Sequence, residues 1–310
     1  MTLSSEAAAF ITSPMFASRF PENGLNDETA SLAFLAASRS VKYPVSKPEK
    51  CPVGRLIETE IAPEVPIRIY VPQGEGPFAV MLYFHGGGWV AGELDQYDLT
   101  CRIFSKSANL VVINVGYRLA PEHPFPQPVE DCVAAYRWLL EEGVAPERIA
   151  FFGDSAGGNL CLAAGLLAAR DGIPLPAAMV LASPAPDLTF SGPSNVAKRD
   201  VDPFSRIDNP ARMVEYYLRG ADPRDPLASP VFADLTGFPP LLIMVGPDET
   251  LVDDCHALAE RATKCGVDTE LQVVEGAFHT WLGYAGVIPE ADDCITRIGT
   301  FIAKHTRGTL

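Results

Sequence analysis

The 310-residue sequence predicts an α/β fold in which a mostly parallel sheet of eight strands has helices on both faces. Two observations lead to this prediction. Short apolar runs recur along the chain, and helical stretches separate them from the third run onward. Strands that alternate with helices favour parallel pairing, because each crossover helix returns the chain to the same end of the sheet. No linker or internal repeat interrupts the pattern, so we expect one main domain.

The predicted strands are 54–61, 66–72, 79–84, 109–115, 148–152, 178–183, 240–245 and 270–275. The first two have no helix between them, so they should form an antiparallel edge of the sheet. The clearest predicted helices are 126–142, 156–170 and 251–265. They follow the fourth, fifth and seventh strands and should cover the faces of the sheet.

Two regions, 1–45 and 189–230, do not fit the alternation of strands and helices. The first contains scattered apolar residues on either side of a Pro-Glu-Asn-Gly turn, and it predicts one or two short helices. The second is rich in proline and charge, with a helical patch at 213–218. We expect both to form a helical cap on the main domain, 46–310, and to line an apolar pocket. The alternative is that residues 1–45 only pack on the core.

A Gly-Asp-Ser-Ala-Gly pentapeptide at 153–157 lies between the fifth predicted strand and the helix after it. Such a tight turn exposes its central side chain, Ser155, above the sheet and tolerates little but glycine on either side. The N–H groups at the start of the next helix point toward the same place. The pattern predicts Ser155 as a nucleophile, although glycine-rich turns also bind phosphate or simply pack.

A His-Gly-Gly-Gly-Trp run at 85–89 directly follows the third predicted strand. Consecutive glycines leave their N–H groups unshielded, so these can approach an oxygen that becomes negatively charged. Each such donor is worth about 3 kcal/mol in the transition state. We expect Gly87, Gly88 and the N–H group of Ala156 to form an oxyanion hole. A flexible glycine turn is the alternative for this run alone, but the pentapeptide at 153–157 favours a site.

The histidines available as a general base are His85, His123, His256, His279 and His305. His279 lies in the loop just beyond the last predicted strand, where the chain order serine, acid, histidine places the base. The other four lie, in chain order, in the glycine run, a proline-rich turn, a helical pattern and the polar C-terminal tail. By elimination we predict His279 as the base.

The acid partner of this histidine should follow the seventh predicted strand, where Asp248 and Glu249 stand. Its role is to accept a hydrogen bond from the imidazole Nδ1–H group and to stabilise the imidazolium. Asp253 and Asp254 are predicted to open the next helix instead, because carboxylates are favourable at a helix N-terminus. The position in the chain leaves both Asp248 and Glu249 open.

With these motifs the chain resembles the bacterial hormone-sensitive-lipase-like (family IV) carboxylesterases of the α/β-hydrolase superfamily. The matching segments are the glycine run at 85–88, Tyr-Arg-Leu-Ala-Pro-Glu-His-Pro-Phe-Pro at 117–126, Gly-Asp-Ser-Ala-Gly-Gly at 153–158 and the His279 loop. The resemblance implies an α/β-hydrolase fold with a helical cap, hydrolysis of short- to medium-chain esters, and no cofactor. It also implies that the acid stands two residues before a Leu-x-Asp sequence, which is Glu249 here in place of the usual aspartate.

These residues predict acyl transfer in two steps through an acyl-enzyme on Ser155. Amide or lactone cleavage would use the same groups and stays open. A non-catalytic ligand-binding protein on the same fold is a third hypothesis, which the intact Ser155, His279 and glycine run disfavour. In the proline-rich segment 117–126 we expect Arg118 and Glu122 to form an ion pair, with Asp131 as a further partner.

Composition limits the partners. A formal net charge of −15 disfavours nucleic acid and anionic membrane surfaces as partners. The expected partner, a small-molecule ester, is what the resemblance implies. The first twenty residues lack the features of a signal peptide, and no apolar run is long enough to span a membrane. Seven scattered cysteines predict reduced thiols in a cytoplasmic protein, with no metal site. Whether the chain forms a homodimer is left open.

Overall fold

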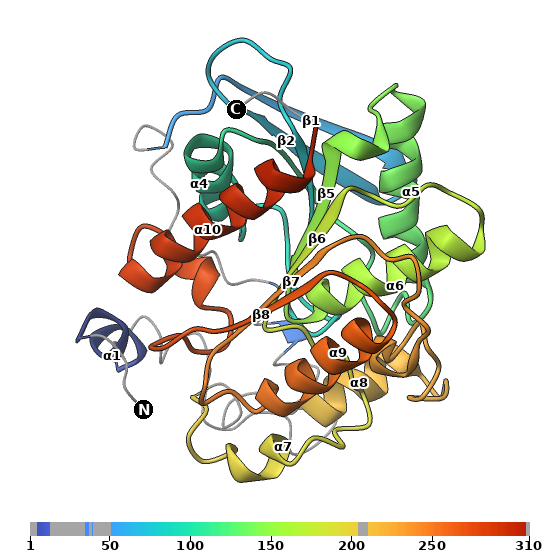
Figure 1. The fold of residues 1–310 in the computed structure, drawn as a ribbon, viewed down its shortest axis with the longest axis vertical. Coiled ribbons are helices and arrows are strands. Elements are labelled where there is room, and N and C mark those ends of the chain that lie inside the picture. Colours follow the sequence, from blue (N-terminus) through green and yellow to red (C-terminus); the bar gives the residue numbers. More distant parts are fainter. Residues whose placement is uncertain (1–4, 13–34, 37–38, 40–50, 204–209, 308–310) are drawn as a thin grey trace.

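The computed structural model describes residues 5–12, 35–36, 39, 51–203 and 210–307 (Figure 1). Within 1–45, the prediction of one or two short helices is met by α1 (Ser5–Ile11), and the remainder lies mostly outside the described residues.

One sheet of eight strands runs through the molecule, in the order β1-β2-β4-β3-β5-β6-β7-β8. The strands are β1 (Arg55–Ala62), β2 (Val65–Val71), β3 (Val80–Phe84), β4 (Val111–Val115), β5 (Ile149–Asp154), β6 (Ala178–Ala182), β7 (Leu241–Val245) and β8 (Thr269–Val273). Each predicted strand is confirmed, with ends that differ by at most two residues.

Strand β2 is antiparallel to both of its neighbours, and the remaining pairs are parallel. This confirms the predicted antiparallel edge. In the centre of the sheet, Phe84 at the end of β3 lies opposite Val115 of β4 and Gly153 of β5. The carboxyl ends of β3 and β5 are therefore level, which brings the glycine run at 85–88 next to the pentapeptide at 153–157.

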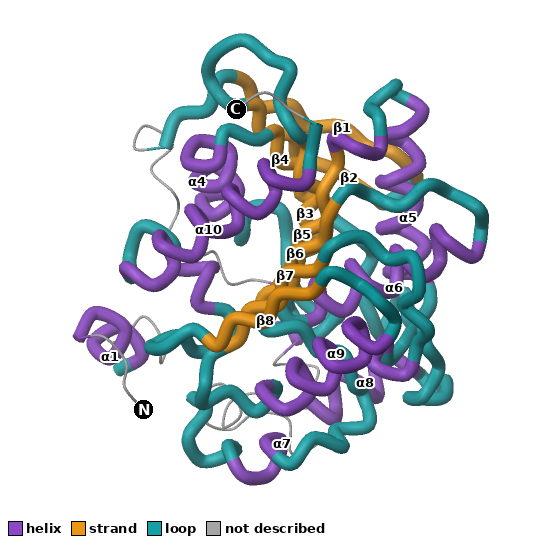
Figure 2. The backbone as a smooth tube through the Cα atoms, in the orientation of Figure 1, coloured by secondary structure: helices purple, strands orange, loops and turns teal. Residues whose placement is uncertain are grey.

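The longer helices are α4 (Asp98–Ala108), α5 (Gln127–Glu141), α6 (Ala156–Arg170), α9 (Val252–Lys264) and α10 (Pro289–His305). Figure 2 shows α4 and α10 on one side of the sheet and α5, α6 and α9 on the other. The three predicted helices correspond to α5, α6 and α9, and Asp253 and Asp254 lie in the first turn of α9 as predicted.

The placement of His305 in a polar tail was wrong, because α10 extends to this residue. Ile295, Ile298 and Ile302 recur at helical spacing along α10 and are buried. They belong to the apolar layer between α10 and the sheet. Polar residues occupy the other face of α10 and are interspersed with the buried ones in the sequence, so the segment was interpreted as polar.

Two apolar layers lie on opposite faces of the sheet. Along β3, Leu82 and Phe84 belong to the layer that includes residues of α5 and α6. Met81 and Tyr83 belong to the layer that includes residues of α4 and α10. All four side chains are at most 1 % exposed. A strand buried on both faces reads as the continuous apolar run seen in the sequence.

The region 189–230 contains α7 (Ser194–Ala197) and α8 (Pro210–Leu218), which confirms the helical patch predicted at 213–218. All seven cysteines are free thiols, as expected, and five of them are buried. Within the described part of the chain, no helix combines the length and the apolar character needed to cross a membrane.

Candidate active site

Ser155 stands in a strained turn between β5 and α6. Its backbone has φ 55° and ψ −118°, a conformation that residues with a side chain rarely adopt. Two glycines make the turn sterically possible. A Cβ atom at Gly153 would overlap the backbone of Gly157, and one at Gly157 would overlap the carbonyl oxygen of Phe84. The turn holds the Ser155 side chain half-buried at the carboxyl end of the sheet.

Three loops bring Ser155, His279 and Glu249 into one hydrogen-bonded line. The Ser155 hydroxyl donates to His279 Nε2 at 2.9 Å, and His279 Nδ1–H donates to Glu249 Oε2 at 2.9 Å. The loops follow β5, β8 and β7, whose carboxyl ends lie at the same edge of the parallel sheet. This spacing matches that of a nucleophile, a base and the acid that orients the base.

Glu249, and not Asp248, contacts the histidine. The Glu249 side chain is 1 % exposed, and its second oxygen, Oε1, accepts hydrogen bonds from Ser183 Oγ at 2.7 Å and Gly246 N at 2.6 Å. Asp248 instead forms an ion pair with Lys198 at 3.0 Å. No role was predicted for Ser183, although its position directly after β6 places it at the same edge of the sheet.

The glycine run forms a tight turn beside Ser155. Gly87 and Gly88 have φ 114° and 60°, and the N–H groups of Val90 and Ala91 both donate to Gly87 O, at 3.1 and 3.0 Å. A Cβ atom at Gly87 would overlap the carbonyl oxygen of Ala91, so only glycine fits there. At the start of α6, Ala156 presents an N–H group that has no acceptor within the helix.

His85 is buried and holds the glycine run in place through its ring contacts and one hydrogen bond. Its ring stacks between Tyr97 and Tyr117, with centroid distances of 5.2 and 4.2 Å, and its Nδ1–H group donates to Gly86 O at 2.8 Å. Complete burial lowers the pKa of His85 to about 4, so the ring is neutral at pH 7. His279 is the histidine that reaches Ser155.

Comparisons with known proteins decide the family. A family model described as alpha/beta hydrolase fold matches residues 81–283. The chain is 44 % identical to an acetyl-hydrolase of Streptomyces hygroscopicus, over 73 % of this chain and 76 % of that protein. It is 34 % identical to the carboxylesterase NlhH of Mycobacterium tuberculosis, over 84 % of this chain and 85 % of that protein.

A solved esterase from the bacterial hormone-sensitive lipase family is 37 % identical, with a TM-score of 0.85 over 98 % of this chain and 99 % of that chain. The chain belongs to this family of α/β-hydrolase esterases. The predictions of fold class and of a carboxylic ester hydrolase are thereby confirmed.

The ion pairs of the esterase near the glycine run differ from the prediction. Arg118 pairs with Asp131 at 2.7 Å, whereas Glu122 pairs with Arg39 at 2.8 Å. The predicted pair of Arg118 and Glu122 is therefore wrong. Asp131 lies in α5, and its carboxylate also accepts a hydrogen bond from the backbone N–H of Arg118 at 2.9 Å. Asp131, the further predicted partner, thus accepts hydrogen bonds from the backbone N–H, Nε and Nη2 of Arg118.

Helix α8 covers the glycine run of the esterase. A Cβ atom at Gly88 would overlap the sulfur atom of Met213, so this thioether lies directly against the turn. One turn later, the Tyr217 ring stacks on Trp89 with a centroid distance of 4.5 Å and an interplanar angle of 11°. The described part of region 189–230 therefore contributes side chains that cover the glycine run.

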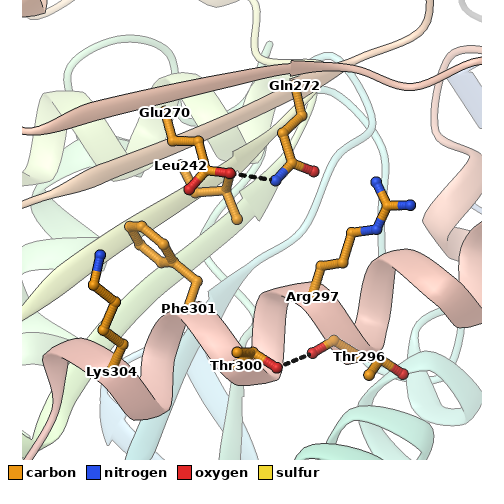
Figure 3. Close-up of a pocket in the computed structure, with 8 residues that line it drawn as sticks. All are labelled: Leu242, Glu270, Gln272, Thr296, Arg297, Thr300, Phe301 and Lys304. Atoms are coloured by element: carbon orange, nitrogen blue, oxygen red, sulfur yellow. Dashed lines mark hydrogen bonds between the residues drawn. The ribbon is translucent and has the colours of Figure 1, made fainter.

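A separate cavity of about 290 Å³ lies between β8 and α10 of the esterase (Figure 3). Figure 3 shows Arg297, Phe301 and Lys304 of α10 extending toward Glu270 and Gln272 of β8. The predicted site residues are not among the residues that line it. The cavity is thus distinct from the candidate active site.

Proposed function

We propose that this esterase hydrolyses carboxylic esters by two-step acyl transfer, with Ser155 as nucleophile, His279 as general base and Glu249 as the acid that orients the base. The observation that carries the proposal is the continuous line of two 2.9 Å hydrogen bonds from Ser155 Oγ through His279 to Glu249. Both distances lie within the reach that proton transfer requires.

In the first step, Ser155 Oγ attacks the ester carbonyl carbon while His279 Nε2 takes the hydroxyl proton. The tetrahedral intermediate collapses, the carbon–alkoxy bond breaks, and the imidazolium gives its proton to the departing alcohol. In the second step, water attacks the acyl-enzyme, and His279 takes a proton from it. Collapse releases the carboxylic acid and returns the proton to Ser155. The Glu249 carboxylate accepts the hydrogen bond from His279 Nδ1–H and stabilises the imidazolium throughout.

The oxyanion of both intermediates would be held by the N–H groups of Gly87, Gly88 and Ala156. Two observations support this assignment: the positive φ values of the two glycines, and the position of Ala156 in the first turn of α6, where backbone N–H groups have no acceptor within the helix. Donors fixed before the reaction stabilise the charge without reorganisation, and each is worth about 3 kcal/mol. Three such donors favour the transition state over the neutral ester.

The substrates we propose are small esters with short to medium acyl chains. Met213 lies against Gly88, and the stacked rings of Tyr217 and Trp89 fill the space beside it. A relative that is 44 % identical is named an acetyl-hydrolase, which agrees with a small acyl group. The side chains of α8 would limit the length of the acyl chain.

We also propose that residues 1–45 and 189–230 together form the cap over the catalytic domain, 46–310. Two described residues of the N-terminal segment support this. Leu35 is buried in the apolar core, and Arg39 donates to Val90 O at 2.8 Å, directly after the glycine run. Removal of residues 1–40 should weaken activity and change the chain-length preference. A folded truncated protein with an unchanged preference would contradict the cap.

The nucleophile is tested by the burst of p-nitrophenol that accompanies acylation by p-nitrophenyl acetate. Wild-type enzyme should release about one equivalent in the burst, and Ser155→Ala should release none. Ser107→Ala, at an exposed serine of α4, is the matched control and should behave as wild type. Turnover retained by folded Ser155→Ala would exclude this serine.

The acid is tested by comparing Glu249→Gln with Asp248→Asn. We expect kcat to fall by about 10³–10⁴-fold for Glu249→Gln, because the amide no longer stabilises the imidazolium or holds its tautomer. Asp248→Asn, which loses the ion pair with Lys198, should change kcat by less than about threefold. A larger loss for Asp248→Asn would reassign the acid.

A further inference from the structure

The residue before the nucleophile, Asp154, is a buried carboxylate that the mechanism above does not use. It ends β5, and its side chain is on the face of the sheet that carries Phe152 and Tyr83. The residue is 4 % exposed. Burial raises the pKa of Asp154 to about 6, while the Tyr83 hydroxyl and the charge of His279 act in the opposite direction.

The hydrogen bonds of Asp154 connect two parts of the candidate site. Its Oδ1 atom accepts from Tyr83 Oη at 2.8 Å and from the backbone N–H of Gly86 at 3.2 Å. The first donor is at the end of β3, and the second is the first glycine of the run at 85–88. One side chain therefore links the turn that carries Ser155 to the turn that carries the oxyanion donors.

The contact between Asp154 and Gly86 is close. A Cβ atom at Gly86 would overlap Asp154 Oδ2, so the backbone of the glycine run lies directly on the carboxylate. The same run is held on its other side by Tyr117, whose hydroxyl donates to His85 O at 2.7 Å. Asp154 holds the run at Gly86, the residue directly before Gly87.

We propose that Asp154 is a positioning residue for ester hydrolysis, whose carboxylate fixes the glycine run so that the N–H groups of Gly87 and Gly88 face the oxyanion on Ser155. This inference rests on the proposed function. Asp154 acts through the backbone of Gly86 rather than on the reacting atoms. Oxyanion donors are useful only at their final distance from the developing charge, so a fixed anchor matters for the transition state.

The inference predicts a kinetic effect on kcat with little effect on KM. In Asp154→Ala the Gly86 N–H loses its acceptor, and the run can move away from Ser155. A displacement on the order of 1 Å costs up to about 10²-fold in rate. Substrate binding in the ground state does not depend on these donors, so KM should stay within about twofold of wild type.

Asp154→Asn is the matched variant, because its amide oxygen can still accept from Gly86 and Tyr83 while the charge is lost. We expect it to retain most of the wild-type kcat. Asp154→Ala, with kcat reduced by about 10- to 100-fold, should also bind a trifluoromethyl ketone more weakly by the same factor. Such a ketone adds to the serine and forms an oxyanion, so its affinity reports the oxyanion hole and not general stability.

Three results would overturn the inference. The first is a folded Asp154→Ala enzyme with kcat within threefold of wild type. The second is an Asp154→Asn enzyme as impaired as Asp154→Ala, since charge and not position would then be decisive. The third is an Asp154→Ala enzyme whose affinity for the ketone falls by a factor different from the fall in its kcat.

If Asp154→Ala does not fold, Tyr83→Phe replaces it. This change removes one of the two donors to Asp154 Oδ1 and leaves the core filled. We expect kcat to fall several-fold at unchanged KM, and an unchanged kcat would overturn the inference. Ser155→Ala, measured in parallel, separates this result from a failure of the proposed function. Activity retained by Ser155→Ala contradicts the function itself.

Discussion

At the scale of single residues, the proposed acid, Glu249, is a glutamate held by several hydrogen bonds. Glutamate is one methylene longer than aspartate, so its carboxylate needs to be held at a defined place. Ser183 Oγ and Gly246 N–H both bind Glu249 Oε1, which leaves Oε2 for His279. Two donors on one oxygen fix the orientation of the carboxylate and keep its other oxygen within hydrogen-bond distance of the imidazole.

We therefore expect Ser183→Ala to reduce kcat by about 10- to 150-fold, since one hydrogen bond to a charged group is worth about 1.5–3 kcal/mol. Steady-state kinetics with p-nitrophenyl acetate would measure the change. Glu249→Asp should show a larger loss than Ser183→Ala, because the shorter side chain withdraws from His279. Wild-type kcat in folded Ser183→Ala would show that the Gly246 N–H suffices to hold Glu249.

The sequence predicted Ser155 and His279 because each depends on local signals. The glycines around Ser155 force one backbone conformation, and His279 follows a strand at the catalytic edge of the sheet. The choice between Asp248 and Glu249 depends on side-chain direction within one short loop. Adjacent residues point to different sides of such a loop, and only the folded chain shows which of them faces His279.

At the scale of elements, α8 covers the glycine run next to the proposed nucleophile. Its patch at 213–218 was predictable from apolar periodicity. Its contact with Gly88 was not, because it joins segments far apart in the sequence. The ion pair of Glu122 shows the same limit. Its partner, Arg39, comes from the N-terminal segment, and nothing near Glu122 in sequence indicates it.

Truncation of Met213 should lengthen the accepted acyl chain. Met213→Ala removes the thioether that lies against Gly88, so a longer chain gains room beside the reacting carbon. We expect the ratio of kcat/KM for the octanoate ester to kcat/KM for the acetate ester to rise by about 10-fold or more. This is the size of effect that one or two methylene contacts produce. A series of p-nitrophenyl esters measures this ratio.

Glu215→Ala is the control for this prediction, because Glu215 lies on the same helix and is exposed. Its chain-length profile should match that of wild type. If Met213→Ala and Glu215→Ala give the same profile, α8 does not limit the acyl chain.

At the scale of the whole molecule, the eight strands, the antiparallel edge and the helices on both faces followed from pattern alone, whereas the order of the strands in the sheet is known only from the structure. The eight runs were apolar enough to be recognised, since buried parallel strands have no polar face. Helix α10 was not predicted, because its apolar residues lie on one face only and are separated in the sequence by polar residues of the other face.

Global stability should depend on pH through Asp154. Burial raises its pKa from 3.8 to about 6, so the folded state binds the proton more tightly than the unfolded chain. The resulting penalty is absent below about pH 4 and complete above about pH 6. It amounts to about 3 kcal/mol, as about two pKa units imply. The contribution of Asp154 to the free energy of unfolding therefore falls as the pH rises from about 4 to about 6.

We expect Asp154→Asn to be more stable than wild type at pH 7.5, with an advantage that disappears toward pH 4. Urea unfolding at several pH values measures the difference. Glu93→Gln, at an exposed carboxylate, is the control and should differ little from wild type at any pH. A constant difference between Asp154→Asn and wild type from pH 4 to 7.5 would show that Asp154 does not titrate in this range.

The most direct test of the account is to locate the covalent intermediate. Wild-type enzyme is treated with a p-nitrophenyl alkylphosphonate, which traps an activated serine, and its peptides are analysed by mass spectrometry. We predict one adduct per chain, on the peptide that contains Ser155, with complete loss of esterase activity and no adduct in Ser155→Ala. An adduct on another residue, or equally fast inactivation of Ser155→Ala, would contradict the proposed mechanism.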